Sequence, residues 1–148
     1  MKISIKKIAK NSRVAFENTI NTTKKNIVLK KFSNLLLKNK KRILKENIKD
    51  IKFAKKKNLK ENLIKRLEID ENKITSIISS IDSIIKIKDP TNKILDKWKR
   101  PNGLIIHKVT VPIGVIGVIY ESRPNVTSDV ASLCFKSGNA VILKGGSE

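Results

Sequence analysis

Hydrophobic residues recur at helical spacing through the first ninety positions of the chain. Segments 25–53, 59–69 and 74–85 each place apolar residues on one face and polar residues, mostly lysine, serine or threonine, on the other. The first segment is either one amphipathic helix or two helices that break near Asn39. Asp70 provides a cap signal for the third segment, and Asp89, which precedes a proline, ends the helical pattern. The pattern predicts a helical N-terminal part.

The pattern changes after the proline. Residues 89–103 are a polar, turn-rich connection that holds the only tryptophan, Trp98, and a Pro-Asn-Gly turn signal. Segment 104–111 is rich in β-branched residues and is expected to form a strand. Segment 113–120 is a continuous apolar run, which suits a strand buried on both faces of a parallel sheet.

The last part of the chain is expected to complete a strand, helix, strand unit. Segment 125–139 is predicted to be a helix, with Thr127 or Ser128 as its cap and a Gly-Asn stop at its end. Segment 140–144 is a second buried strand. Such a unit places its two strands parallel, which makes this an α/β fold. Ligands of parallel sheets bind beyond the carboxyl ends of the strands, and here those ends lead into 120–125 and 144–148.

The first strand end carries an unusual density of polar groups. Arg123 can grip a phosphate or carboxylate with its two-pronged guanidinium, and Asn125 can donate to an oxygen that develops negative charge. Pro124 fixes the turn, while Glu121 and Ser122 can orient their neighbours. The alternative is a surface ion pair between the arginine and the glutamate beside an asparagine turn.

The second strand end is rich in glycine. Gly145 and Gly146 allow the backbone to approach a ligand, and Lys144 supplies a positive charge for a phosphate. Ser147 and Glu148 can hydrogen-bond a hydroxyl group or a ribose. The segment matches neither the G-x-G-x-x-G fingerprint nor a P-loop. A tight turn with a solvated lysine is therefore the competing interpretation.

The net charge of +20 raises nucleic acid or an anionic membrane surface as a partner. However, 28 of the 33 basic residues are lysine. Phosphate and base contacts favour arginine, so a lysine excess spread over many helical faces fits a compositional bias of the genome. Aromatic residues make up only 4% of the chain, which argues against a stacking platform for single-stranded nucleic acid. We therefore expect neither a nucleic-acid nor a membrane partner.

Two residues invite catalytic interpretations that the pattern does not support. Cys134, the only cysteine, lies in the middle of the predicted helix between apolar neighbours, so it is expected to be a buried structural thiol. His107, the only histidine, lies within a predicted strand, and nothing marks it as a base. No metal site is expected. The lone cysteine, the absence of a signal-peptide pattern and the absence of a long apolar run predict a cytoplasmic protein.

The residues resemble a known family over much of the chain. The resemblance is carried by LKENIKDI, by WKRPNGL and, almost continuously from Val111 to Glu148, by VPIGVIGVIYESRPNVTSDVASLCFKSGNAVILKGGSE. These segments look like the N-terminal portion of the gamma-glutamyl phosphate reductase (glutamate-5-semialdehyde dehydrogenase) family, in the aldehyde dehydrogenase superfamily. The implied fold has N-terminal helices followed by the first β-α-β unit of an incomplete parallel Rossmann-like sheet.

The resemblance also implies a reaction and its ligands. The family reduces L-glutamate 5-phosphate to the 5-semialdehyde with NADPH and releases phosphate, a step in proline biosynthesis. By resemblance Lys144 would lie near the adenosine ribose or its 2′-phosphate, with Gly145, Gly146, Ser147 and Glu148 in the same cofactor segment. The turn with Glu121 and Ser122 would line the active site, and from chemistry and position we expect Arg123 to hold an anionic oxygen and Asn125 to lie near the acyl oxygen or phosphate.

Further expectations concern the organisation of the chain. Residues 1–92 would be the helical part of a cofactor-binding domain, and residues 113–148 would be the start of the NADPH-binding sheet. Residues 93–112 would be a connection and a strand that serve oligomerisation. The nucleophilic cysteine is expected downstream, so this segment alone would be an inactive N-terminal fragment. The complete enzyme is expected to be a homo-oligomer and to associate with glutamate 5-kinase. A basic nucleic-acid-binding or other non-catalytic interaction module is the alternative function.

Overall fold

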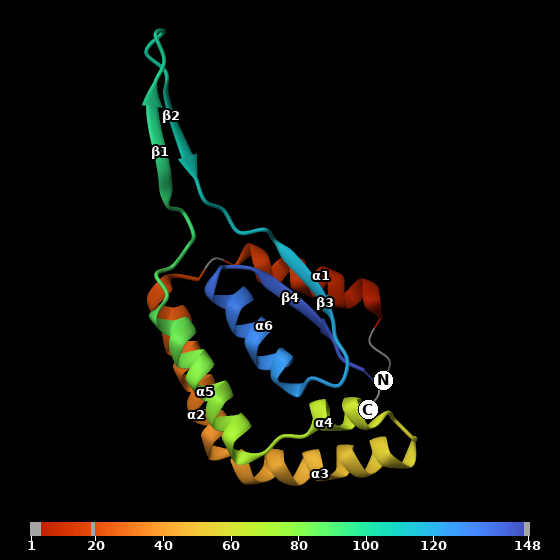
Figure 1. Ribbon diagram of the computed structural model, residues 1–148. Coiled ribbons are helices and arrows are strands. Elements are labelled where there is room, and N and C mark those ends of the chain that lie inside the picture. Colours follow the sequence, from red (N-terminus) through yellow and green to blue (C-terminus); the bar gives the residue numbers. More distant parts are fainter. Residues whose placement is uncertain (1–3, 19, 147–148) are drawn as a thin grey trace.

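The computed structural model describes residues 4–18 and 20–146, in which helices surround a small parallel sheet and a hairpin projects from one end (Figure 1). The helices are α1 (Ile5–Glu17), α2 (Thr22–Lys38), α3 (Lys40–Lys56), α4 (Glu61–Leu67), α5 (Glu71–Lys86) and α6 (Pro124–Lys136). The predicted helix over 25–53 is indeed two helices, separated at Asn39. The Asn39 side chain donates to the Leu35 carbonyl oxygen at 2.8 Å, which satisfies the end of α2.

Helix α1 was not predicted. Its few apolar residues are separated by lysines, although they recur at helical spacing, and none of its side chains is buried. The helix packs against β3 (Val115–Ile119) and β4 (Ala140–Lys144). Contact with the sheet therefore accounts for its position.

The core lies where α2, α5 and α6 meet. Leu29, Ile81 and Ile84 are its buried centre, and Phe32 and Phe135 pack against it. The buried Lys136 ties α6 to the other two helices, because its Nζ donates to Asn26 Oδ1 at 2.6 Å and to the Ile85 carbonyl oxygen at 2.9 Å. These contacts fix the axis of α6, which determines where its N-terminus points.

Strands β3 and β4 pair in parallel, as predicted, with Val115 opposite Ala140 and Ile119 opposite Lys144. Helix α6 connects them, and Gly138 ends the helix with a φ of +74°. The prediction that β3 is buried on both faces was wrong. Ile119 is 80% exposed, because β4 is the one partner of β3 in the described part of the chain.

The predicted cap of α6 was also wrong. The helix begins at Pro124, with Arg123 as the residue before it, and neither Thr127 nor Ser128 caps it. Proline suits the first helical position because its fixed φ matches the helix and its missing N–H would have no helical partner. Ser128 instead donates to the Asn125 carbonyl oxygen at 2.8 Å, and the Thr127 hydroxyl lies 2.6 Å from the Tyr120 hydroxyl.

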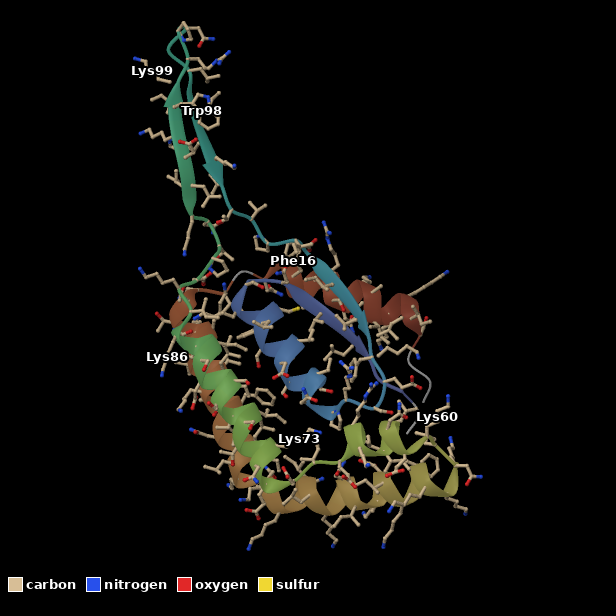
Figure 2. The ribbon with its side chains drawn as sticks, in the orientation of Figure 1. Phe16, Lys60, Lys73, Lys86, Trp98 and Lys99 are labelled. Carbon is tan, nitrogen blue, oxygen red and sulfur yellow. The ribbon has the colours of Figure 1, made fainter. Side chains whose placement is uncertain are left out.

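The projecting hairpin consists of β1 (Ile94–Lys99) and β2 (Ile105–Val109), paired antiparallel (Figure 1). The predicted strand in 104–111 is confirmed, but the segment before it, predicted to be a polar connection, forms β1. Its lysines and aspartate hid the strand pattern, and pairing with β2 supplies its backbone hydrogen bonds. Trp98 and Lys99 lie toward the far end of the hairpin, away from the helices (Figure 2).

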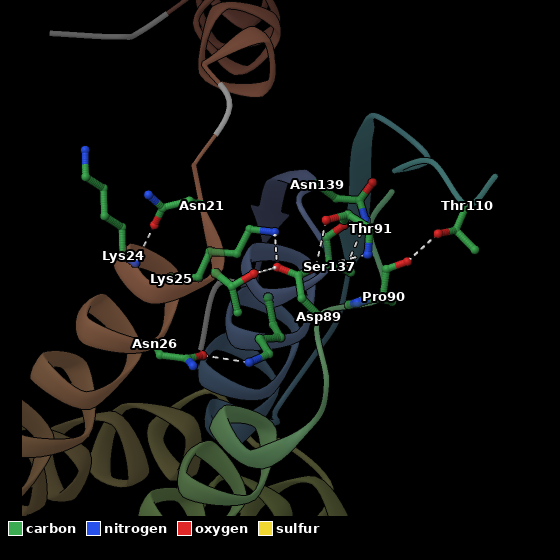
Figure 3. Close-up of polar contacts among 12 residues, drawn as sticks. Asn21, Lys24, Lys25, Asn26, Asp89, Pro90, Thr91, Thr110, Ser137 and Asn139 are labelled. Atoms are coloured by element: carbon green, nitrogen blue, oxygen red, sulfur yellow. Dashed lines mark hydrogen bonds and ion pairs between the residues drawn. The ribbon is translucent and has the colours of Figure 1, made fainter. Parts of the chain in front are cut away.

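A partly buried polar network holds the base of the hairpin (Figure 3). Asp89 Oδ2 accepts from Lys25 Nζ at 2.9 Å and from Thr22 Oγ1 at 2.7 Å, and its Oδ1 accepts from the N–H and hydroxyl of Thr91. Thr110 Oγ1 donates to the Pro90 carbonyl oxygen at 2.6 Å. The network joins α2 to the segment that precedes β1 and to the residue that follows β2.

Candidate functional site

The two strand ends singled out by the sequence lie side by side. The backbone N–H of Tyr120 donates to the Lys144 carbonyl oxygen at 3.1 Å, which extends the pairing of β3 and β4 by one step. A side chain on Gly145 would lie 3.8 Å from the Tyr120 ring, in ordinary contact. The structure therefore brings the polar turn and the glycine segment together at the carboxyl edge of the sheet, where ligands of parallel sheets bind.

The turn between β3 and α6 is tightly folded. Ser122 has a φ of +48° and is buried at 3% exposure, so its side chain faces the protein interior. Glu121 and Arg123 on either side of it are exposed. Neither forms an ion pair with another described residue, so the predicted alternative of an arginine–glutamate surface pair is not formed in this part of the chain. Within residues 4–18 and 20–146, no carboxylate is paired with the Arg123 guanidinium.

The N-terminus of α6 opens at the same edge. Its first backbone N–H groups and the positive end of its dipole favour an anion there. Asn125 is half-buried, and its Nδ2 donates to Asp129 Oδ2 at 3.1 Å. An amide group has two N–H donors, so one remains for a ligand. Asp129 Oδ1 is buried without a hydrogen-bond partner among the described residues.

The glycine segment is open to solvent. Lys144, Gly145 and Gly146 are exposed, and Lys144 pairs with no carboxylate in the described residues. Ser147 and Glu148, which were also predicted to bind the cofactor, lie outside the described residues. An exposed, unpaired lysine beside two glycines fits a phosphate or a sugar phosphate, whose oxygens accept from the ammonium group and from backbone N–H groups.

A cleft that the sequence did not suggest opens beside the same turn. It has a volume of about 360 Å³ and lies between α3, Ile69 and Pro124. Arg42, Glu46 and Asp50 line it from one face of α3. Their spacing of four residues was a signal that could have indicated a shared face, but the surrounding lysines concealed it.

The two residues that sequence reasoning set aside stay outside the site. Cys134 is buried at 7% exposure, as predicted, and burial raises the pKa of its thiol. A thiol with a raised pKa is a poor nucleophile at neutral pH. His107 is exposed on β2, away from the carboxyl edge of the parallel sheet.

Comparison with known proteins decides the family. No family model matches the chain. It is 49% identical over its full length to gamma-glutamyl phosphate reductase from Nautilia profundicola, and 52% identical over 129 residues to that from Nitratiruptor. It also superimposes on the crystal structures of the enzyme from Thermotoga maritima and from Saccharomyces cerevisiae, with TM-scores of 0.88 and 0.92 at 41% and 35% identity. The chain is a homologue of the N-terminal part of gamma-glutamyl phosphate reductase.

The match covers nearly all of this chain but only part of the relatives. The chain spans about a third of their length, 36% for the N. profundicola reductase and 34% for the T. maritima structure. The predicted fold, N-terminal helices followed by a β-α-β unit of an incomplete parallel sheet, is confirmed by both reductase structures. In the part of the chain that the structure describes, none of the helices is long and apolar enough to cross a membrane.

Proposed function

We propose that this chain forms the cofactor-binding part of an enzyme that reduces L-glutamate 5-phosphate to L-glutamate 5-semialdehyde with NADPH and releases phosphate. This reaction is a step in proline biosynthesis. The observation that supports this most directly is the adjacency of the two strand ends, joined by the hydrogen bond from Tyr120 N–H to the Lys144 carbonyl oxygen. One end offers a guanidinium, an amide and a helix N-terminus, and the other offers a lysine and two glycines. Both the acyl phosphate and the cofactor are anionic.

The proposed role of each residue is assigned from its position and its chemistry. Lys144 would bind the adenosine ribose or its 2′-phosphate, and the exposed backbone of Gly145 and Gly146 would let the cofactor approach. Arg123 would hold an anionic oxygen of the acyl phosphate, and the remaining N–H of Asn125 would donate to the acyl oxygen or phosphate. The buried Ser122 would hold the turn, with Glu121 at its rim.

Bound NADPH would supply the hydride. In the proposed reaction a cysteine from the other two thirds of the reductase attacks the acyl phosphate, and phosphate leaves. The residues of this chain hold the two anionic ligands and orient the acyl group toward that cysteine. Cys134 is not the nucleophile, because it is buried in α6 between the two strands.

The same proposal extends to organisation and location. Residues 1–92 and 113–148 would form one cofactor-binding domain, and residues 93–112, which include the hairpin, would serve oligomerisation. A cytoplasmic homo-oligomer that associates with glutamate 5-kinase follows from the family resemblance.

The proposal can be tested with a chimeric reductase, in which this chain replaces the matching segment of the N. profundicola enzyme. In the reverse direction the chimera should oxidise L-glutamate 5-semialdehyde in the presence of NADP⁺ and phosphate, with the unmodified N. profundicola enzyme as the positive control. A chimera that folds, by circular dichroism and size-exclusion chromatography, but lacks this activity would contradict the proposal.

A further inference from the structure

The cleft beside the active-site turn is built from one face of α3. Arg42, Glu46 and Asp50 are four residues apart and therefore share that face, and the opposite wall is formed by Ile69 and Pro124. Pro124 is the first residue of α6 and directly follows Arg123. The cleft is thus next to the position where the acyl phosphate is proposed to bind.

The walls of the cleft are held in place by a buried asparagine. Asn47, at 3% exposure, donates from Nδ2 to the Leu67 carbonyl oxygen at 2.9 Å and accepts at Oδ1 from the Ile69 N–H at 2.7 Å. The two ends of its amide therefore hold α3 to the last residue of α4 and to the segment that follows α4. The charged residues on α3 face a wall whose position is fixed.

Of the three charged side chains in the cleft, only Glu46 has a hydrogen-bond partner among the described residues. Glu46 accepts hydrogen bonds from Lys49 Nζ at 2.9 Å, which lowers its pKa. Asp50 has no hydrogen bond or ion pair with a described residue, and burial together with the charge of Glu46 raises its pKa. Arg42 likewise donates no hydrogen bond to a described residue. The charge of Lys49 offsets part of the shift at Asp50, but the Lys49 ammonium donates its hydrogen bonds to Glu46.

A ligand that satisfies both groups carries one negative and one positive charge. The backbone positions of Arg42 and Asp50 are roughly 12 Å apart along the helix axis. The arginine side chain is long enough that one amino-acid head group could contact both its guanidinium and the Asp50 carboxylate. The substrate of the proposed reaction has its phosphate at one end and its α-ammonium and α-carboxylate groups at the other. A phosphate near Arg123 would direct the amino-acid end toward the α3 cleft.

We propose that the α3 cleft recognises the amino-acid end of the substrate, with Asp50 accepting hydrogen bonds from the α-ammonium group and Arg42 donating to the α-carboxylate. This inference rests on the proposed function and adds the residues that select an α-amino acid over other acyl phosphates and aldehydes. Neither Arg42 nor Asp50 acts on the reacting carbonyl group, so both are specificity residues.

The test compares three aldehydes in the oxidation assay of the chimeric reductase. L-Glutamate 5-semialdehyde has both groups, 5-oxopentanoate lacks the α-ammonium, and 4-aminobutanal lacks the α-carboxylate. Asp50→Asn should raise the KM for L-glutamate 5-semialdehyde and for 4-aminobutanal at least about tenfold, as expected for losing a hydrogen bond to a charged group, and leave that for 5-oxopentanoate unchanged. Arg42→Gln should raise the KM for L-glutamate 5-semialdehyde and 5-oxopentanoate, and leave that for 4-aminobutanal unchanged.

Two matched controls separate recognition from folding. Lys45→Gln removes a charge from the exposed surface of α3 outside the cleft, and Asp96→Asn does so on the hairpin. Both should leave all three KM values unchanged. Equal KM increases for all three aldehydes in Asp50→Asn, or no increase for any, would overturn the inference while leaving the proposed function intact. Failure of the unsubstituted chimera to oxidise L-glutamate 5-semialdehyde would overturn both.

Discussion

The carboxylate of Asp89 accepts hydrogen bonds from Thr22 and Lys25 in α2 and from Thr91 before the hairpin (Figure 3). Its side chain is 12% exposed and that of Lys25 is 5% exposed. Burial alone raises the pKa of Asp89, but the hydrogen bonds from Thr91, Lys25 and Thr22 outweigh it and hold this pKa well below its usual range. The ionised form therefore stabilises the fold.

Replacing this carboxylate should be costly and should change the response to acid. Asp89→Asn leaves Lys25 buried without a counter-charge, and we expect the free energy of unfolding to fall by about 3 kcal/mol. Because the pKa of Asp89 is lowered on folding, its contribution is present above the unfolded-state pKa of about 4 and is lost as the pH falls below it. Urea unfolding of the chimera from pH 7 to pH 3 should show a shallower acid loss for the variant.

The control for this experiment is Asp82→Asn, since the ion pair of Asp82 with Lys30 is partly exposed, with side-chain exposures of 37% and 57%. A pair of this kind contributes less than about 1 kcal/mol. Equal losses of stability in the two variants would contradict the role assigned to Asp89.

Arg123 is expected to act on turnover rather than on stability. Its side chain is exposed and forms no ion pair with a described residue. Arg123→Ala in the chimera should therefore lower kcat/KM for the acyl-phosphate reaction by more than about tenfold, equivalent to roughly 1.4 kcal/mol, while the melting temperature stays unchanged. Arg100→Ala, at the hairpin turn, is the matched control, and an Arg123→Ala enzyme with unchanged kcat/KM would remove Arg123 from the site.

The sequence predicted where candidate residues lie when they follow a strand, and it missed those that lie elsewhere. The positions of Arg123 and Lys144 at neighbouring strand ends follow from the rule that parallel strands share a carboxyl edge. The α3 cleft could not be found this way, because it depends on how α3 meets Pro124, which lies far along the sequence. Asp89 was interpreted only as a helix terminator, since its partner Lys25 is one lysine among 28.

Among the structural elements, the end of α6 depends most on a single glycine. Gly138 has a φ of +74°, and a Cβ there would lie 3.1 Å from Thr91 Cγ2 and 3.2 Å from Pro112 Cγ. Gly103, in the hairpin turn, has a φ of +88° but no atom within 4 Å of its Cβ position. The two glycines share a positive φ, which would strain any other residue, and they differ in how crowded the Cβ position is.

Substituting both glycines separates the two effects. Gly103→Ala should cost about 1 kcal/mol of unfolding free energy through strain alone. Gly138→Ala should cost more, about 2 to 3 kcal/mol, because the hairpin base must also move away from α6. Denaturant unfolding of the two variants in the chimera measures this difference, and an equal cost would show that the contact with Thr91 and Pro112 carries no strain.

Elements with a strong period were predicted, and those with interrupted patterns were not. Helix α5, with its isoleucine face, and the apolar β4 were both expected from the sequence. In contrast, α1 and β1 contain few apolar residues between their charged ones, although those of α1 recur at helical spacing. Each forms because another element, the parallel sheet for α1 and β2 for β1, supplies the contacts that its own sequence does not indicate.

As a whole, the molecule consists of a packed helical core, which holds the parallel sheet, and a hairpin that projects from it. The α2, α5 and α6 core fixes α6, and α6 in turn fixes the carboxyl edge of β3 and β4. The hairpin extends from the other end, with Trp98 40% exposed. The two loops at this edge are thus held by the helical core, and this arrangement suits the proposed site, which must position two anionic ligands.

The most direct test of the proposed cofactor site is the affinity of the chimeric reductase for NADPH, measured by isothermal titration calorimetry. The unsubstituted protein is compared with Lys144→Ala and with the control Lys108→Ala, which removes an exposed lysine from β2. We predict that Lys144→Ala weakens NADPH binding at least about tenfold, as expected for loss of a charged hydrogen bond, without lowering the melting temperature. Lys108→Ala should bind like the unsubstituted protein. Equal NADPH affinity in all three proteins would contradict the placement of the cofactor at the end of β4.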